Sequence, residues 1–118
     1  MGTIRELAEL LARTKFRFSD EYGLQDGIEA LLKREGVSYQ REVRLSPRDR
    51  IDFLLGDIGI EVKVDSSEIV VERQLMRYAT DPRIGSLILV SSRFRHQSMP
   101  QFLNGKPLRS VYLIGSIF

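Results

Sequence analysis

The sequence of 118 residues contains no cysteine. This absence excludes disulfides, thiolate zinc sites, iron–sulfur clusters and a cysteine nucleophile. Histidine occurs once, as His96, so a zinc site built from clustered histidines has no support. A lone histidine between predicted elements indicates a surface residue rather than a catalytic one. Neither a Gly-x-x-x-x-Gly-Lys loop nor a Gly-x-Gly-x-x-Gly loop is present, so the sequence predicts no nucleotide cofactor.

Long apolar runs are also missing. Because no stretch of about 18 apolar residues occurs, we expect no membrane partner. The segment 1–13 carries acidic residues and lacks a small-residue cleavage site, so it does not resemble a signal peptide. Together with the absence of cysteine, these features predict a non-secreted, cytoplasmic protein of prokaryotic or phage type. The length suits one domain over residues 1–118.

Basic residues outnumber acidic residues only slightly. The formal net charge is only +2, but 14 of the 18 basic residues are arginines. The planar arginine head group matches the geometry of phosphate. Arginine enrichment can also reflect a surface biased toward stability. On composition alone, both interpretations stay open.

Apolar residues at helical spacing predict two helices near the start of the chain. Thr3 is a suitable N-cap for the first helix, and Ser19 or Asp20 for the second. Gly36 is placed to end the second helix. The buried stripes that this spacing predicts are Ile4, Leu7, Ala8 and Leu11, then Leu24, Ile28, Leu31 and Leu32.

From residue 37 the apolar pattern changes from helical to alternating, which predicts strands. We expect strands over 37–45, 50–55, 58–64, 87–90 and 111–114, and a helix from Ser66 or Ser67 to Ala79. The segment 93–105 is polar, with room for a short helix. A strand–helix–strand order over 58–90 predicts a parallel pair. The fold class is therefore α/β, with a mixed central sheet flanked by helices.

A hairpin between the second and third strands carries the most informative charges. Gly56 suits the first central position of a two-residue type II′ turn, which pairs Leu55 with Ile58. Counting back along the hairpin places Asp52 directly opposite Glu61. A three-residue loop would shift this register by one position and weaken the argument.

Strict alternation then separates the hairpin side chains into two faces. Asp52, Glu61 and Lys63 share one face, and the apolar residues, with Ile51 beside Phe53, share the other. Like charges directly opposite each other destabilise a sheet. A divalent cation, Mg²⁺ or Mn²⁺, would explain the carboxylate pair. A Glu-x-Lys tripeptide alone is usually a solvated ion pair, so the prediction depends on the whole arrangement.

Several short motifs together resemble one nuclease superfamily. Arg50-Ile-Asp52 followed by Ile60-Glu-Val-Lys63 resembles the PD-(D/E)xK signature, with isoleucine in place of the proline. Gln74-Leu-Met-Arg-Tyr78 is similar to the Gln-x-x-x-Tyr motif of RecB-type nucleases, and the absence of cysteine excludes their iron–sulfur branch. The helix that carries Glu21 resembles those of virus-type replication–repair nucleases and Holliday-junction resolvases. The resemblance covers a core of about residues 19–92.

This resemblance implies a restriction-endonuclease-like αβββαβ core and a metal-dependent DNA nuclease. Such an enzyme would hydrolyse phosphodiester bonds, selecting DNA structure, in repair, recombination or replication. The resemblance implies that Asp52, Glu61 and the carbonyl of Val62 hold Mg²⁺ or Mn²⁺. Lys63 would contact the attacking water, and Gln74 would orient Lys63 or contact a phosphate. For the helix residue of the site we favour Glu21, with Gln25 and Glu29 as alternatives.

The implied partner is DNA, and several arginines are placed to contact its phosphates. These candidates are Arg50, Arg73, Arg77, Arg93 and Arg95. We also expect a homo-oligomer, a dimer or larger, because a small nuclease has little surface with which to hold a duplex. The alternatives are a nuclease-like fold that binds nucleic acid without cutting it, and a plain α/β interaction domain. The sequence leaves open endonuclease or exonuclease action, and DNA or RNA.

Overall fold

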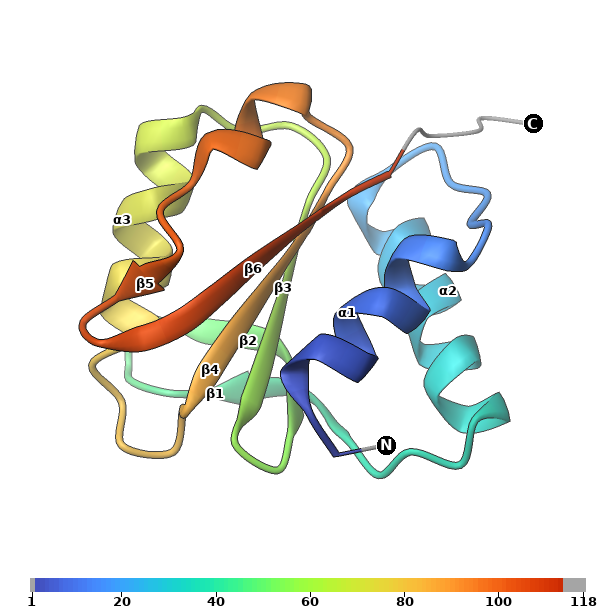
Figure 1. The fold of residues 1–118 in the computed structure, drawn as a ribbon, viewed down its shortest axis with the longest axis horizontal. Coiled ribbons are helices and arrows are strands. Elements are labelled where there is room, and N and C mark those ends of the chain that lie inside the picture. The colour runs from blue at the N-terminus through green and yellow to red at the C-terminus, as the bar shows by residue number, and fades with distance from the viewer. Residues whose placement is uncertain (1, 114–118) are drawn as a thin grey trace.

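The computed structural model describes residues 2–113, in three helices, a short 3₁₀ helix and six strands (Figure 1). In chain order these elements are α1 (Ile4–Arg13), α2 (Glu21–Arg34), β1 (Gln40–Arg44), β2 (Arg50–Leu55), β3 (Ile58–Lys63), α3 (Glu68–Tyr78), β4 (Ser86–Ser91), η1 (Phe94–Ser98), β5 (Phe102–Leu103) and β6 (Lys106–Tyr112). Within this described range, no helix is both long and apolar enough to cross a bilayer.

The strands form one mixed sheet in the order β1-β2-β3-β4-β6-β5. Neighbours β1, β2 and β3 are antiparallel, β3, β4 and β6 are parallel, and β5 returns antiparallel to β6. Figure 1 shows α1 and α2 on one face of the sheet and α3 on the other. This is a three-layer α/β arrangement, as the sequence predicts, and the predicted parallel pair of β3 and β4 is confirmed.

Each face of the sheet has its own apolar core. Phe53, Ile60 and Val62 pack with the buried stripes of α1 and α2. Leu87 and Leu89 pack with α3 on the other face. Every residue of β4 is buried, because this strand is covered by helices on both sides.

The predicted helix starts hold in detail for the first two helices. Thr3 caps α1 by accepting the amide of Glu6 at 3.1 Å, and Asp20 caps α2 by accepting the amide of Gly23 at 2.7 Å. In α3, Ser67 is the N-cap residue but its side chain makes no capping hydrogen bond. The predicted start of α3 is therefore confirmed in position, and the predicted side-chain cap is wrong.

The end of the chain differs from the prediction. The strand expected over 111–114 begins earlier, as β6 at Lys106, and Ile114 lies outside the described residues. Asn104 and Gly105 have φ angles of 51° and 75°, and they connect β5 to β6. Two successive positive φ angles belong to a type I′ turn, for which Asn-Gly is the strongest sequence signal. The prediction missed this hairpin because the segment 93–105 is polar.

His96 is buried, not on the surface as predicted. Its side chain is 1% exposed and lies between the end of β4 and the segment before α3. Nδ1 is 2.6 Å from the Ser91 hydroxyl, and Nε2 is 2.8 Å from the Ser66 carbonyl oxygen. Because a carbonyl can only accept a hydrogen bond, Nε2 carries a proton. His96 therefore links η1 to the end of β4 and to the segment between β3 and α3.

A packing prediction follows from Gly59 in the middle of β3. A Cβ atom at this position would clash with Ile51 Cδ1 and would lie 3.0 Å from Leu87 Cδ2. We expect Gly59→Ala to lower the free energy of unfolding by about 1–3 kcal/mol through overpacking. Urea denaturation measures this loss. Gly2→Ala is the matched control, because nothing lies within 4 Å of a Cβ at that position; equal losses in the two variants would contradict the packing argument.

Candidate active site

The ladder between β2 and β3 is interrupted beyond Phe53. Backbone pairing follows the predicted register from the Leu55–Ile58 pair at the turn to the Phe53–Ile60 pair, and Gly56 in the turn has a φ of 59°. The next pair, Asp52 with Glu61, was predicted to continue the ladder and does not. The predicted register is therefore confirmed from the turn to Phe53, and the predicted pairing of Asp52 with Glu61 in the ladder is wrong.

Two carboxylates take the place of the missing backbone partners. The amide of Asp52 donates to Glu61 Oε1 at 3.3 Å. The amide of Val62 donates to Asp52 Oδ2 at 2.8 Å. The side chains of Asp52 and Glu61 are therefore drawn into the gap between the strands, which keeps them side by side without a ladder pair.

The alternation of β2 also changes at Asp52. Ile51 packs with Leu54 against α3, whereas Phe53 faces α1 and α2. The prediction that Ile51 and Phe53 share a face is therefore wrong. On the far side of Asp52, Glu42 in β1 has a φ of 57°, so the neighbouring strand is distorted at the same level. The irregular positions of both strands therefore coincide at Asp52.

Burial makes both carboxyl groups weaker acids than usual. Glu61 is 3% exposed. Its burial, and next the charge of Asp52, raise its pKa to about 8. The pKa of Asp52 is also raised, first by burial and then by the charge of Glu21, against the opposing effect of its bond from Val62. Both shifts mean that this pair resists carrying two negative charges without a counter-charge.

Two further side chains contact Glu61. The Lys63 Nζ atom lies 3.4 Å from Glu61 Oε2. The hydroxyl oxygen of Tyr78 lies 3.1 Å from Glu61 Oε2 and 3.1 Å from the carbonyl oxygen of Arg50. A tyrosine hydroxyl has one proton to donate, so it cannot donate to both acceptors at once. When Glu61 is protonated, it can donate to Tyr78 while Tyr78 donates to Arg50, which satisfies all three groups.

Tyr78 is the residue of this site that sequence reasoning undervalued. It belongs to the Gln-x-x-x-Tyr motif, but only Gln74 was expected to act in the site. Gln74 is half-buried one turn before Tyr78, and its side chain makes no hydrogen bond within residues 2–113. The helical i, i+4 spacing was the available signal, since it places both side chains on one stripe of α3.

The three candidate residues of α2 separate clearly. Glu21 Oε1 accepts the amide of Val64 at 3.3 Å, so Glu21 reaches the end of β3 near Lys63. Gln25 and Glu29 instead accept hydrogen bonds from Arg41 in β1. The geometry therefore brings Glu21, and not the other two, to the carboxylate pair.

The predicted phosphate-binding arginines are in different situations. Three already have partners: Arg50 pairs with Glu42 at 3.2 Å, Arg93 pairs with Asp65 at 2.8 Å, and Arg77 makes a two-pronged contact with Asp49. Arg73 and Arg95 are exposed and form no ion pair within the described part of the chain. Arg77 is thus the candidate with the fewest donors left for a phosphate.

The carboxylate pair offers part of a ligand set for a divalent cation. Among residues 2–113, no three histidine or acidic side chains are grouped as a ready-made metal site. What is present is the buried Glu61 beside the half-buried Asp52, and burial raises the pKa of both carboxyl groups, so the pair favours a bound proton or cation over two uncompensated charges. Oxygen ligands of this kind suit Mg²⁺ or Mn²⁺ when water or a backbone carbonyl completes the set. The structure shows the amide of Val62 holding Asp52, while a ligand role for the Val62 carbonyl stays a prediction.

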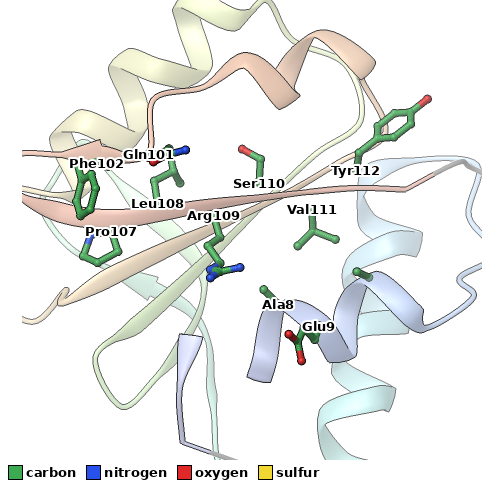
Figure 2. Close-up of a pocket in the computed structure, with 11 residues that line it drawn as sticks. Ala8, Glu9, Gln101, Phe102, Pro107, Leu108, Arg109, Ser110, Val111 and Tyr112 are labelled. Carbon is green, nitrogen blue, oxygen red and sulfur yellow. The ribbon is translucent and has the colours of Figure 1, made fainter. Parts of the chain in front are cut away.

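A groove elsewhere on the molecule does not contain the site. This groove, of about 590 Å³, lies between α1 and the outer side of β6. Figure 2 shows Ala8 and Glu9 on one wall and Arg109 and Val111 on the other. None of the predicted catalytic residues lines it, so its size alone does not mark it as the active centre.

Comparison with known proteins adds no relative: no protein-family model matches the chain, and neither a curated protein nor a solved structure matches it. The geometry of the carboxylate pair therefore carries the functional argument by itself.

The acidity of Glu61 predicts how stability depends on pH. Its pKa is about 8 in the folded protein, against an ordinary 4.5, so the native state holds the proton more tightly than the unfolded chain. Its contribution to stability is complete below about pH 4.5 and is lost as pH rises through about 8. In EDTA, we expect the free energy of unfolding to fall across this range by a few kcal/mol, at about 1.4 kcal/mol per pKa unit.

Urea denaturation at a series of pH values measures this dependence. Glu61→Gln imitates the protonated side chain and should flatten most of the profile while raising stability at the alkaline end. Glu9→Gln removes an exposed carboxylate of α1 and should leave the profile unchanged. A wild-type profile that rises between mildly acidic and alkaline pH would contradict the assignment.

Proposed function

We propose that this protein is a metal-dependent DNA nuclease that hydrolyses phosphodiester bonds. The observation that carries the proposal is the carboxylate pair on β2 and β3. Glu61 accepts the amide of Asp52, Asp52 accepts the amide of Val62, and Lys63 contacts Glu61. Enclosing two neighbouring carboxyl groups within a sheet costs stability, although each accepts a backbone amide. A cation site for phosphate chemistry explains both the pair and the lysine beside it.

The order of elements supports a restriction-endonuclease-like core. From α2 to β4 the chain runs α2-β1-β2-β3-α3-β4, which has the αβββαβ order of that fold. The proposed catalytic residues lie on β2 and β3 at the end away from their connecting turn, and Glu21 lies at the start of α2. The side chains thus come from three elements, at the end of β2 and β3 that is opposite their connecting turn.

The proposed chemistry assigns a distinct task to each residue. A bound Mg²⁺ or Mn²⁺ would lower the pKa of a water molecule and neutralise charge on the phosphoryl oxygens. Asp52, Glu61 and the Val62 carbonyl would hold the ion. Lys63 is half-buried, and its ammonium group would orient the attacking water and pair with a non-bridging phosphate oxygen.

Tyr78 and Glu21 are proposed to position the site rather than to contact the substrate. Tyr78 can donate to Glu61 once this residue is ionised, which fixes the direction of the carboxylate. Glu21 holds the backbone at Val64, immediately after Lys63. Gln74 is proposed to contact Lys63 or a phosphate when substrate is bound.

The proposed substrate is DNA, selected by its structure, in repair, recombination or replication. Arg73 and Arg95 are the exposed candidates for phosphate contact, and Arg50 and Arg93 lie beside the site with acidic partners they could exchange for phosphate. A second copy of the chain would extend this basic surface, so we propose a homo-oligomer as the form that binds DNA.

Metal binding can be tested without any substrate. We expect Mn²⁺ or Mg²⁺ to raise the melting temperature of the wild-type protein, because metal at 100 times its dissociation constant adds about 2.7 kcal/mol to the free energy of unfolding. Asp52→Asn should abolish this increase, because it removes a charged ligand while preserving an acceptor for the Val62 amide. Asp57→Asn, at the turn end of the same hairpin, is the control and should respond to metal as wild type does. An unresponsive wild-type protein would argue against the metal site.

Cleavage is tested on a panel of labelled DNA structures: linear duplex, single strand, flap, nick and four-way junction. We expect cutting that requires Mg²⁺ or Mn²⁺, stops in EDTA and falls at least about 100-fold in Lys63→Ala, which removes charge stabilisation from the transition state. Lys33→Ala, on the exposed end of α2, should cut normally. If the wild-type protein binds these substrates but cuts none, the fold serves as a nucleic-acid-binding module instead.

A further inference from the structure

Two exposed aromatic side chains stand together beyond the ends of the parallel strands. Phe94 in η1 is 71% exposed and Tyr112 at the end of β6 is 37% exposed. Their rings meet edge to face, with centroids 5.9 Å apart and an interplanar angle of 87°. Large aromatic rings usually contribute to stability by being buried. The exposed pair therefore presents apolar ring surface that the core does not use, with the face of one ring supported by the edge of the other.

This aromatic pair lies close to Lys63. In the sheet, Lys63 is the register partner of Ser91, which is in turn the partner of Tyr112. Neighbouring strands are about 4.8 Å apart, so Tyr112 lies roughly 10 Å across the sheet from Lys63. Register partners in a parallel sheet share a face, and Figure 2 shows Tyr112 pointing away from α1, the helix on the opposite face.

Phe94 approaches the same point along the chain. The amide of Ser92 donates to the carbonyl of Lys63 at 3.3 Å, and Phe94 follows two residues later. The buried His96 fixes this segment through its contacts to Ser91 and Ser66. The backbone segment that carries Phe94 is therefore anchored beside Lys63 and Ser66.

Basic residues precede and follow Phe94 in the sequence. Arg93 and Arg95 enclose Phe94 in the sequence, Arg95 is exposed, and Arg93 is held beside the site by Asp65. Aromatic rings beside arginines match single-stranded nucleic acid, whose bases stack on the rings while its phosphates meet the positive charges. Bases in an intact duplex are already stacked on each other and cannot use such a surface.

We propose that Phe94 and Tyr112 form a stacking platform for an unpaired base close to the scissile phosphate. The substrate class is then DNA with a single-stranded segment at the cut, such as a flap, an overhang or a free single strand. This inference rests on the proposed nuclease function for the position of the cut, but base stacking on the platform does not need catalysis. The two proposals can therefore be tested separately.

The binding test uses fluorescence anisotropy in EDTA, with a labelled single strand and a blunt duplex of the same sequence. We expect Phe94→Ala and Tyr112→Ala each to weaken single-strand binding by about 5- to 100-fold, the range for losing one base–aromatic stack. Duplex affinity should stay unchanged. Phe102→Ala is the matched control, since Phe102 is 62% exposed and lies at the other end of β6 (Figure 2).

Circular dichroism and urea denaturation establish that each variant is folded. Tyr112→Phe preserves the ring and should bind like wild type, which separates stacking from hydrogen bonding. A single abasic position, moved stepwise along the strand, should reproduce the loss in the wild-type protein at one place only and add nothing to the loss in Phe94→Ala. Equal single-strand affinity in wild type, Phe94→Ala and Tyr112→Ala would overturn the platform, even if the wild type is an active nuclease.

The opposite combination is equally informative. If the wild-type protein cuts no DNA in Mg²⁺ or Mn²⁺ but its single-strand binding depends on Phe94 and Tyr112, the platform stands and the proposed nuclease activity fails. If both aromatic variants lose affinity for duplex as much as for single strand, base stacking is not the cause and the platform is overturned. A change in self-association without any change in single-strand affinity would likewise overturn it and assign the pair to a protein contact.

Discussion

The packing of the half-buried Asp52 against the buried Glu61 constrains the strands around the open end of the hairpin. Each carboxyl group replaces a backbone partner across β2 and β3, so the ladder ends where the site begins. At the same level, Ile51 departs from the alternation of β2 and Glu42 has a positive φ angle. Because two backbone amides donate their hydrogen bonds to these carboxyl groups, the residues of the proposed site also hold β2 and β3 together. Alanine at either position would leave a buried donor without a partner, whereas asparagine or glutamine preserves an acceptor.

Sequence reasoning was most successful where one local rule acts alone. Cap residues fixed the starts of α1 and α2, and Gly56 fixed the register of the hairpin near its turn. The alternation of apolar residues placed Glu61 and Lys63 on one face. The same rule failed at Ile51, because alternation assumes an uninterrupted pleat and side chains had replaced the ladder. The Asn104-Gly105 turn was readable from the sequence but was outweighed by the polarity of its surroundings.

The remainder of the site depends on tertiary contacts that no local pattern contains. Tyr78 reaches Glu61 only because α3 packs across β3, and Glu21 was selected over Gln25 and Glu29 only by the direction in which α2 meets the sheet. The burial of His96 could not be deduced from its polar neighbours, because its partners Ser66 and Ser91 are distant in sequence or lie in another element. These positions show that a motif names the chemistry of a site, whereas packing decides which neighbours serve it.

The raised pKa of Glu61 links metal binding to the release of a proton. With a pKa of about 8 this carboxyl group is mostly neutral at pH 7, so the formal net charge of +2 becomes +3 in the metal-free protein. A cation held between Asp52 and Glu61 must expel that proton into the buffer. The heat of binding would then contain the ionisation enthalpy of the buffer, and calorimetry in two buffers of different ionisation enthalpy would count the protons released.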